Sequence, residues 1–513
     1  MIAAVAMMMG SSCSALEPVV DASGSGQHLT LAGSPAGIET LDPAQLRDVE
    51  SAFLARQVFR GLVRLDDHLQ PVPDLARSIE VSQEGSEYQF TLHQTATFHD
   101  GSPIDAHAVV RSFNRASDPG LAGDGDWTPP AATYFDGIVG IDARISGAAD
   151  QIAGIEAVDR WNVRIVLDRP EVNFLSRLAG PPAAIVDTRT ANGDNWWQSP
   201  NGSGPFRVKE FAAGSRLVLA PHDGYPGGEP RIQLVTVLFG SQAVQPMNLY
   251  EEGSIDVVSV PSWAVDRVLT PGDALHDDLV QTRTLSTTFI AMNPNIAPFD
   301  DPDVRRMFAG ALDRAKLVEV GFEGNVVLAD GLIPPGIGGQ RWPSDTYEFD
   351  EAKAARIAST HDVDEARPTI YEPGGGIGSV LKADLNEPVG VEIDVIDLSW
   401  PEFSARLVVQ NMASFVLTWV ADYPDPENTL AALLRTGSPD NYLAYSNPEF
   451  DRLVDEAAVE ADDERRRQLY LEAQNVAVRD AVVIPLYHGM SYTLVQPRVR
   501  GLSVTEIGIL SLA

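Results

Sequence analysis

The stretch FVLTWVADYPDPENTLAALL, residues Phe415 to Leu434, predicts a strand, a sharp loop and a helix in direct succession. Its apolar, aromatic and β-branched start is typical of a buried parallel strand. Pro424 and Pro426 prevent that strand from continuing or passing straight into a helix. Asp425 is therefore expected to cap the helix, with Pro426 at its first position. Asp422 then lies beyond the carboxyl end of the strand, where open α/β sheets bind ligands, although an aspartate there can also serve only to cap the turn.

This junction resembles the WxADYxxP sequence of extracytoplasmic solute-binding protein family 5, the oligopeptide/dipeptide-binding lipoproteins of ABC transporters, at Trp419, Ala421, Asp422, Tyr423 and Pro426. In that family the aspartate at the position of Asp422 holds the α-ammonium group of the ligand, so the resemblance implies the same role here. Trp400, in LSWPEF, matches a position where an aromatic residue lines the side-chain pockets. We expect Trp400, Trp419 and Tyr423 to form amphipathic walls around a ligand, with Ala421 beside them.

Further segments resemble the family in the same order along the chain. They are LDP at residues 41–43, FHDGSPIDAHAVVRSFNR at 98–115, SGPF at 203–206, LYEEGSIDV at 249–257 and NPNIAPFDDPDVRRMFAGALDR at 293–314. The resemblance implies an α/β fold of the periplasmic-binding-protein type, in its type II, three-domain peptide-binding variant. In such a fold two lobes enclose an interlobe cleft and close about a hinge.

The same resemblance divides the chain into a discontinuous first lobe, an inserted subdomain and a second lobe. The first lobe is expected at residues 27–48, 171–283 and 486–513, the insert at 49–170 and the second lobe at 284–485. Two crossover strands are expected to form the hinge near Leu285 and Pro485. Within these parts, residues 52–65 carry a helical apolar stripe, and 155–167 predicts a hairpin.

The composition limits the class of partner. The 513 residues are too many for one core and predict two or three domains. A net charge of −35, from 72 acidic and 37 basic residues, argues against nucleic acid as a partner and against docking on anionic lipid through the protein surface.

The first residues, MIAAVAMMMGSSCSA, have an apolar core too short to span a bilayer but typical of a signal peptide. Residues 1–26 are therefore expected to be a signal segment and linker. Cys13, the one cysteine, directly follows this core and resembles the lipidated acceptor of a bacterial lipoprotein. Gly10 stands where such motifs usually have leucine, and no basic residue precedes Ile2. We expect an extracytoplasmic protein anchored through lipid to the outer face of the cell membrane.

The sequence leaves open which group binds the carboxylate end of a ligand. Dipeptide-type receptors place an arginine after the strand that corresponds to Pro368–Tyr371, whereas this chain has EPGGGIGSVLK at residues 372–382. Either Lys382 or the amides of the glycine loop at a helix N-terminus bind the ligand's carboxylate, or the ligand is longer or has none.

The sequence predicts a receptor and not an enzyme. It has no GxSxG, HExxH or Walker sequence, and its nine histidines lack metal-ligand spacing, so no catalytic residue, cofactor or metal is expected. We expect a monomer that captures short peptides and delivers them to ABC permease subunits. Two alternatives remain: the same fold binding nickel, haem, glutathione, an opine or an oligosaccharide, or a lipoprotein of envelope biogenesis or signalling.

Overall fold

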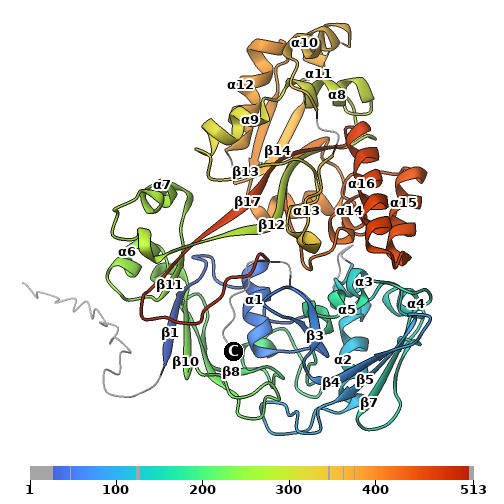
Figure 1. The fold of residues 1–513 in the computed structure, drawn as a ribbon, viewed down its shortest axis with the longest axis vertical. Helices are drawn as coiled ribbons and strands as arrows, with labels where there is room; N and C mark the ends of the chain where they lie inside the picture. The colour runs from blue at the N-terminus through green and yellow to red at the C-terminus, as the bar shows by residue number, and fades with distance from the viewer. Residues whose placement is uncertain are drawn as a thin grey trace, which may run out of the picture.

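Two long antiparallel strands, β12 (Leu279–Met292) and β17 (Val483–Val495), run between the two halves of the molecule (Figure 1). The computed structural model describes residues 27–507 except 47, 123–127, 345–346, 362 and 375. Both strands belong to one 11-stranded sheet with the order β15-β14-β16-β12-β17-β11-β1-β10-β9-β8, and β13 pairs with β17. The sheet therefore continues from one half into the other through these two strands.

The first half is built on the β11 to β8 end of this sheet. Its strands are β1 (His28–Ala32), β8 (Phe206–Ala212), β9 (Arg216–Pro221), β10 (Leu234–Leu238) and β11 (Val257–Ser259). Its helices are α1 (Val49–Val58), α6 (Pro246–Glu251) and α7 (Val265–Leu269).

An insert with two small antiparallel sheets packs beside the first half, at the lower right of Figure 1. The paired strands are β2 (Val63–Leu65) with β3 (Pro71–Pro73), and β4 (Ala76–Val81), β5 (Glu87–Leu92), β7 (Asn162–Val166) and β6 (Ile155–Ala157) in that order. The helices are α2 (Ala106–Ala116), α3 (Ala131–Tyr134), α4 (Ile141–Ile145) and α5 (Phe174–Arg177). Strands β6 and β7 form the hairpin that the sequence predicts.

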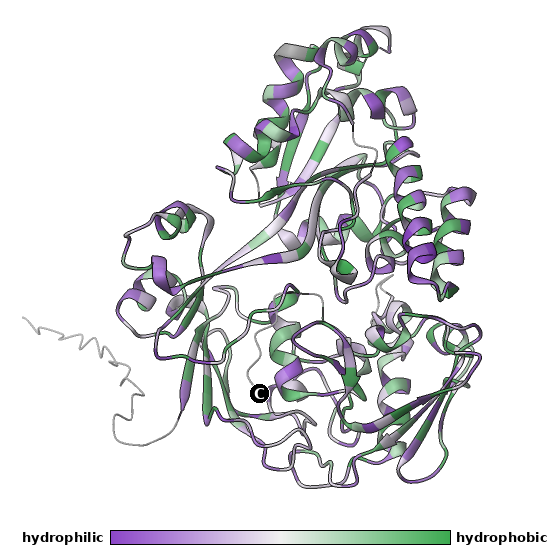
Figure 2. Ribbon diagram, viewed as in Figure 1, coloured by the Kyte–Doolittle hydropathy of each residue, from purple (hydrophilic) through white to green (hydrophobic). Residues whose placement is uncertain are grey.

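The second half places helices on both faces of the other end of the sheet. Its strands are β13 (Val327–Leu328), β14 (Thr369–Pro373), β15 (Asp394–Leu398) and β16 (Ser414–Val420). Its helices are α8 (Pro302–Ala311), α9 (Arg314–Lys316), α10 (Glu351–Thr360), α11 (Val363–Ala366), α12 (Ile377–Val389), α13 (Trp400–Val408), α14 (Glu427–Leu434), α15 (Pro448–Val459) and α16 (Asp463–Arg479). Figure 2 shows hydrophilic and hydrophobic residues interleaved along α15 and α16, as expected of helices that bury one face.

Strand β16 is buried on both faces, which explains its nearly continuous apolar sequence. Phe415 and Leu417 lie in the core cluster formed with α13 to α16, whereas Val416 lies in the cluster formed with α8 and α12. The strand pairs in parallel with β14 but antiparallel with β12. The expected buried strand is therefore present, but in a mixed sheet.

The ladder between β12 and β17 is interrupted near the two residues expected at the hinge. Arg283 pairs with Met490 and Thr287 with His488, so residues 284–286 of β12 bulge opposite Gly489 alone. A second shift follows where Phe289 pairs with Pro485. These irregularities bend and twist the two strands at the place expected for the hinge, which stays a prediction.

Helix α1 differs from expectation in its length and in its neighbours. Phe53 and Val58 pack in the core cluster of β1 and β10, so α1 belongs to the first half, whereas the boundary expected at residue 49 assigned it to the insert. The helix stops at Val58 instead of continuing toward Leu65. The reason is tertiary: the carbonyl of Arg60 accepts the amide of Ile185 (2.8 Å), and Gly61 pairs with Ala184.

Candidate ligand-binding site

The loop after β16 is held by hydrogen bonds that fix the position of Asp422. The amide of Ala421 donates to the carbonyl of Leu285 (2.8 Å), which extends the pairing of β16 with β12 by one residue. The amide of Asp422 donates to Oδ1 of Asn428 (2.9 Å), and Nδ2 of Asn428 donates back to Oδ2 of Asp422 (3.3 Å). Asn428 lies in the first turn of α14, so the helix and the loop orient this carboxylate together.

The prediction that Asp425 is the N-cap, with Pro426 at the first helical position, is wrong by one residue, because Pro426 is itself the N-cap of α14; Asp425 still accepts a hydrogen bond at the helix start. Its Oδ1 accepts the amide of Glu427 (3.0 Å), and α14 begins at Glu427, with Pro426 directly before it. The same oxygen accepts Nη2 of Arg466 from α16 (2.8 Å). Asp425 is therefore an ion-paired structural residue, in contrast to Asp422.

Two residues from the other half of the molecule face Asp422. The groups that act electrostatically on the Asp422 carboxylate from that side are the hydroxyl of Tyr134, at the end of α3, and the positive charge of Arg56, on α1. Enclosure by protein raises the pKa of Asp422, while Asn428, Tyr134 and Arg56 oppose that rise. The side chain nevertheless keeps an accessible surface. By its accessible surface the residue is exposed, so water reaches the carboxylate between these neighbouring groups.

Arg56 is partly buried, and its Nε lacks a direct partner within the described part of the chain. Its Nε is buried and has no hydrogen-bond acceptor among the described residues. Burial lowers its pKa, and the charge of Asp422 opposes that effect. An unsatisfied guanidinium next to an unpaired carboxylate is the arrangement expected of a site that a polar ligand completes.

A second carboxylate, that of Asp440, interacts electrostatically with Asp422 and Tyr134. It lies in the loop between α14 and α15, where the hydroxyl of Tyr442 donates to its Oδ1 (2.8 Å). Burial and the negative charge of Asp422 raise the pKa of Asp440 to about 6. The charge of Asp440 also reaches Tyr134. Arg56, Tyr134 and Asp440 escaped the sequence analysis because no local motif links three segments so far apart in the chain.

Tyr423 is a packing residue and not an exposed wall. Only 1% of its surface is accessible, and its ring packs in the core cluster of the insert. The ring lies 6.3 Å from that of Tyr134, and its hydroxyl donates to Glu427. The expectation that Tyr423 lines a pocket is therefore not met in this structure; the residue instead joins the second half to the insert. Nδ2 of Asn173 adds a second link, because it donates to Oε2 of Glu427 (2.6 Å).

The two tryptophans differ in their contacts with the core of the second half. Trp400 is the first residue of α13, is half exposed, and lies 5.9 Å from the ring of Phe403. Trp419 packs against the same cluster, and its buried Nε1 has no acceptor in the described part of the chain. An exposed indole face and a free indole N–H are both suited to ligand contact, as predicted for these residues.

The glycine loop before α12 does not present a free anion site. The amide of Gly378, in the first turn of α12, donates to Oε2 of the buried Glu372 (2.9 Å), so the protein's own carboxylate occupies this helix start. A pocket of about 210 Å³ beside the loop is lined by Glu372, Gly376, Thr418 and Tyr487, among others, and not by Lys382. Glu372 therefore weakens the glycine loop as a binder of a ligand's carboxylate, because a second negative group there would be repelled, whereas the role of Lys382 stays a prediction.

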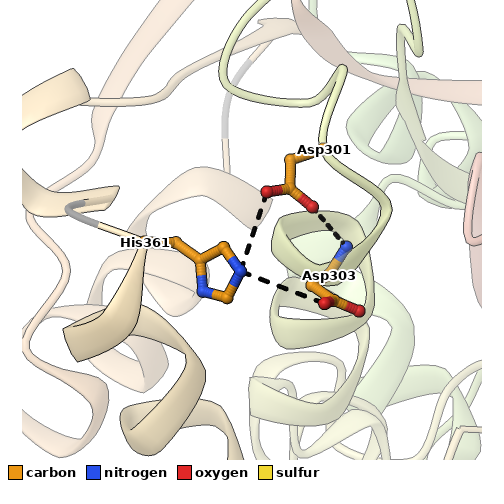
Figure 3. A group of neighbouring side chains, drawn as sticks. All are labelled: Asp301, Asp303 and His361. Carbon is orange, nitrogen blue, oxygen red and sulfur yellow. Dashed lines mark hydrogen bonds and ion pairs between the residues drawn. The ribbon is translucent and has the colours of Figure 1, made fainter.

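One group of side chains in the described part of the chain has the composition of a metal site, although the sequence predicts none. Nε2 of His361 lies 3.7 Å from Asp301 and 3.9 Å from Asp303, between the end of α10 and the start of α8 (Figure 3). Asp301 also caps α8 by accepting the amide of Asp303 (2.8 Å). Ion pairing and capping account for this geometry, so we assign no ion. Helices α8 and α10 lie at the end of the second half away from α3 (Figure 1).

No helix within the described residues is long and apolar enough to cross a membrane. Cys13 and the expected signal segment lie outside the residues that the structure describes.

Comparison with known proteins agrees with this architecture. The profile of the bacterial extracellular solute-binding proteins, family 5, matches residues 70–441. The chain is 27% identical over 462 residues to the probable di/tripeptide-binding protein 5 of Pseudomonas aeruginosa, covering 85% of each chain. It is 24% identical over 483 residues to heme-binding protein A of Haemophilus influenzae, covering 88% of this chain and 86% of that one.

The fold is similar to that of the murein tripeptide binding protein MppA of Escherichia coli, with a TM-score of 0.82, 24% identity, and coverage of 95% of this chain and 96% of that one. These matches cover most of the chain, including the β16–α14 junction. The chain belongs to the bacterial extracellular solute-binding proteins of family 5.

Proposed function

We propose that this chain is the extracytoplasmic receptor of an ABC importer and binds short peptides at the junction after β16. In this proposal Asp422 is the partner of the peptide's α-ammonium group, the one positive charge that every linear peptide has at its start. The family supports a solute receptor, and relatives such as the di/tripeptide-binding protein of Pseudomonas aeruginosa and the oligopeptide-binding protein OppA of Salmonella typhimurium are named for binding peptides.

The observation that carries the proposal is the state of the Asp422 carboxylate. It is oriented by Asn428 and Tyr134, yet it forms no ion pair within the part of the chain that is described. The surrounding protein raises the pKa of this carboxylate although its side chain is exposed, because it loses part of its hydration without gaining a cation. A ligand ammonium group would remove the cost through a charge-assisted hydrogen bond.

Binding would also favour the closed arrangement of the two halves. Asp422 belongs to the second half, whereas Tyr134 and Arg56 belong to the insert and the first half. A ligand that contacts all three stabilises the state in which they lie together, and the bulged ladder of β12 and β17 permits the motion. In hinge-closing receptors the closed state is stabilised by contacts with the ligand that the open state lacks.

We further propose that the mature chain is a monomer attached to the outer face of the membrane through a lipidated Cys13. The support is the position of Cys13 directly after an apolar segment. Mass spectrometry of membrane-extracted protein should find a diacylglyceryl group on Cys13 at the N-terminus. An unmodified Cys13 in that sample would refute the anchor without affecting the ligand.

The experiment that tests the function is a thermal-shift screen. A ligand that binds the folded protein raises its melting temperature by mass action. Peptides of two to five residues should raise it more than sugars, nickel or haem do, and native mass spectrometry of freshly purified protein should show a mixture of bound short peptides. A response to haem, nickel or a glycan and none to peptides would show that the solute class is wrong.

A further inference from the structure

The pocket beside the glycine loop has one charged residue in its lining, the buried Glu372. The pocket measures about 210 Å³, whereas a cavity needs only about 10 to 15 Å³ to hold one water molecule, so there is room for a side chain. Only 5% of the surface of Glu372 is accessible. Its carboxylate accepts the amide of Gly378 at the start of α12, but it forms no ion pair with any described residue. The pocket therefore has a negative group without a cation of the protein to balance it.

The rest of the lining is mainly apolar and aromatic. Phe322 and Tyr487, whose ring centroids are 4.5 Å apart, both line the pocket, together with Val380 and Val416. Among the described residues that line it there is no lysine or arginine. Apolar side chains can cover the methylene stem of a long basic side chain, and its charged end is stabilised by a carboxylate or an aromatic face. The lining therefore suits a group with an apolar stem and a positive end.

The pocket lies at the same edge of the sheet as Asp422. Strands β14 and β16 are parallel neighbours, so their carboxyl ends point the same way, and the pocket is lined by Pro373 from the end of β14 and Thr418 from near the end of β16. The four residue steps from Thr418 to Asp422 span at most about 13 Å of extended chain. A peptide of two to five residues is about 7 to 17 Å long when extended. A peptide bound through its ammonium group at Asp422 can therefore place a later side chain in this pocket.

We infer that the pocket beside Glu372 is a subsite for a positively charged side chain of the ligand, so that the receptor favours peptides that contain lysine or arginine. The inference rests on the proposed function and specifies its ligand class. A carboxylate in the same pocket would face Glu372 and be repelled. The subsite therefore also disfavours acidic side chains.

The test measures the affinities of tripeptides by calorimetry. Lysine replaces the first, second or third residue of trialanine, and each peptide is compared with one that has norleucine there, which keeps the four-carbon stem and lacks the charge. At one position or more, the wild type should bind the lysine peptide at least about tenfold more tightly than the norleucine peptide. Glutamate at that position should bind more weakly than norleucine.

Two variants and a matched control connect the preference to the pocket. Glu372→Gln removes the charge and keeps an oxygen to accept the amide of Gly378, so it should abolish the lysine preference while leaving the affinity for the norleucine peptide nearly unchanged. Thr418→Lys, at an exposed position of the lining, supplies a cation and should abolish the preference as well. In the control, Asp397→Asn, the replaced carboxylate accepts the amide of Gly374 (2.9 Å) in the same loop but does not line the pocket, so the lysine preference should remain.

The outcomes separate the two proposals. Equal binding of the lysine and norleucine peptides at all three positions overturns the subsite and leaves peptide binding intact. A lysine preference that survives Glu372→Gln, or one that Asp397→Asn also abolishes, overturns the subsite too, because the preference would then come from another group or from the general negative charge of the protein. If no peptide binds to the wild type, the proposed function fails and the subsite fails with it.

Discussion

Replacing Asp422 with asparagine removes one charge while leaving the shape of the junction unchanged. An asparagine oxygen can still accept Nδ2 of Asn428 and the hydroxyl of Tyr134, and the backbone amide at this position still donates to Asn428. The change therefore tests the charge of Asp422 and not the turn. If the carboxylate binds a ligand ammonium group, the variant should lose affinity for peptides with a free N-terminus.

The size of the loss follows from the enclosure of the carboxylate. Truncating one partner of a desolvated, hydrogen-bonded charge pair costs roughly 2 to 5 kcal/mol. We expect the lower part of this range, because Asp422 keeps an edge open to solvent that weakens its Coulomb attraction. A loss of about 2 to 3 kcal/mol corresponds to a roughly 30- to 150-fold weaker affinity.

Without ligand, Asp422→Asn should be more stable than the wild type, although it binds peptides more weakly. A carboxyl group whose pKa is raised by folding stabilises the protein when protonated and loses that contribution as the pH rises through the raised value. At neutral pH the wild-type charge is therefore unfavourable without ligand. Asp422→Asn should melt at a higher temperature than the wild type when both are free of ligand, and this advantage should disappear below pH 4.

Calorimetry with trialanine and N-acetyl-trialanine measures the predicted difference. The acetylated peptide lacks the ammonium group, so its affinity should be nearly the same for wild type and variant. Asp425→Asn is a matched control, since Asp425 is three residues away but already paired with Arg466; it should reduce stability without changing the ratio between the two peptides. Equal losses of affinity for both peptides in Asp422→Asn would show that Asp422 only caps the turn and does not bind the ammonium group.

Two other substitutions test the crossing strands. Gly489→Ala should lower the free energy of unfolding in urea by about 1 to 3 kcal/mol, because the added Cβ would lie 2.4 Å from the hydroxyls of Thr284 and Ser286. Adding Ser286→Gly to the same chain should recover part of this loss. An unchanged urea midpoint for Gly489→Ala would contradict the bulge geometry. Burial lowers the pKa of His488 to about 4 from an ordinary value of 6.5, so its contribution to stability is present above pH 6.5 and is lost as the pH falls toward 4. His488→Gln should remove up to about 3 kcal/mol of that pH dependence, and an identical pH profile in the variant would show that His488 is not buried in its neutral form.

Several elements follow from local sequence alone, because the residues that define them are neighbours in the chain. Asp105, Asp301 and Asn447 cap helices α2, α8 and α15 as their positions indicate. The apolar run before Asp422 forms β16, and the two prolines separate it from α14. The order of the family-like segments was enough to identify the fold and the family, since the residues that make each segment recognisable are close together in the chain.

The surroundings of the site depended on tertiary structure. Tyr423 looks like an exposed aromatic residue in the sequence, but the insert covers it, and the glycine loop looks like an anion site until Glu372 fills it. Asp440 and Tyr134 carry no local signal, because their importance comes from charges on distant segments. The sequence by itself determined the family and the receptor class, and it placed Asp422 in the loop after β16, where its role in binding a ligand stays a prediction. Only the tertiary structure decided which other charges face Asp422, since electrostatic neighbours are set by packing and not by distance along the chain.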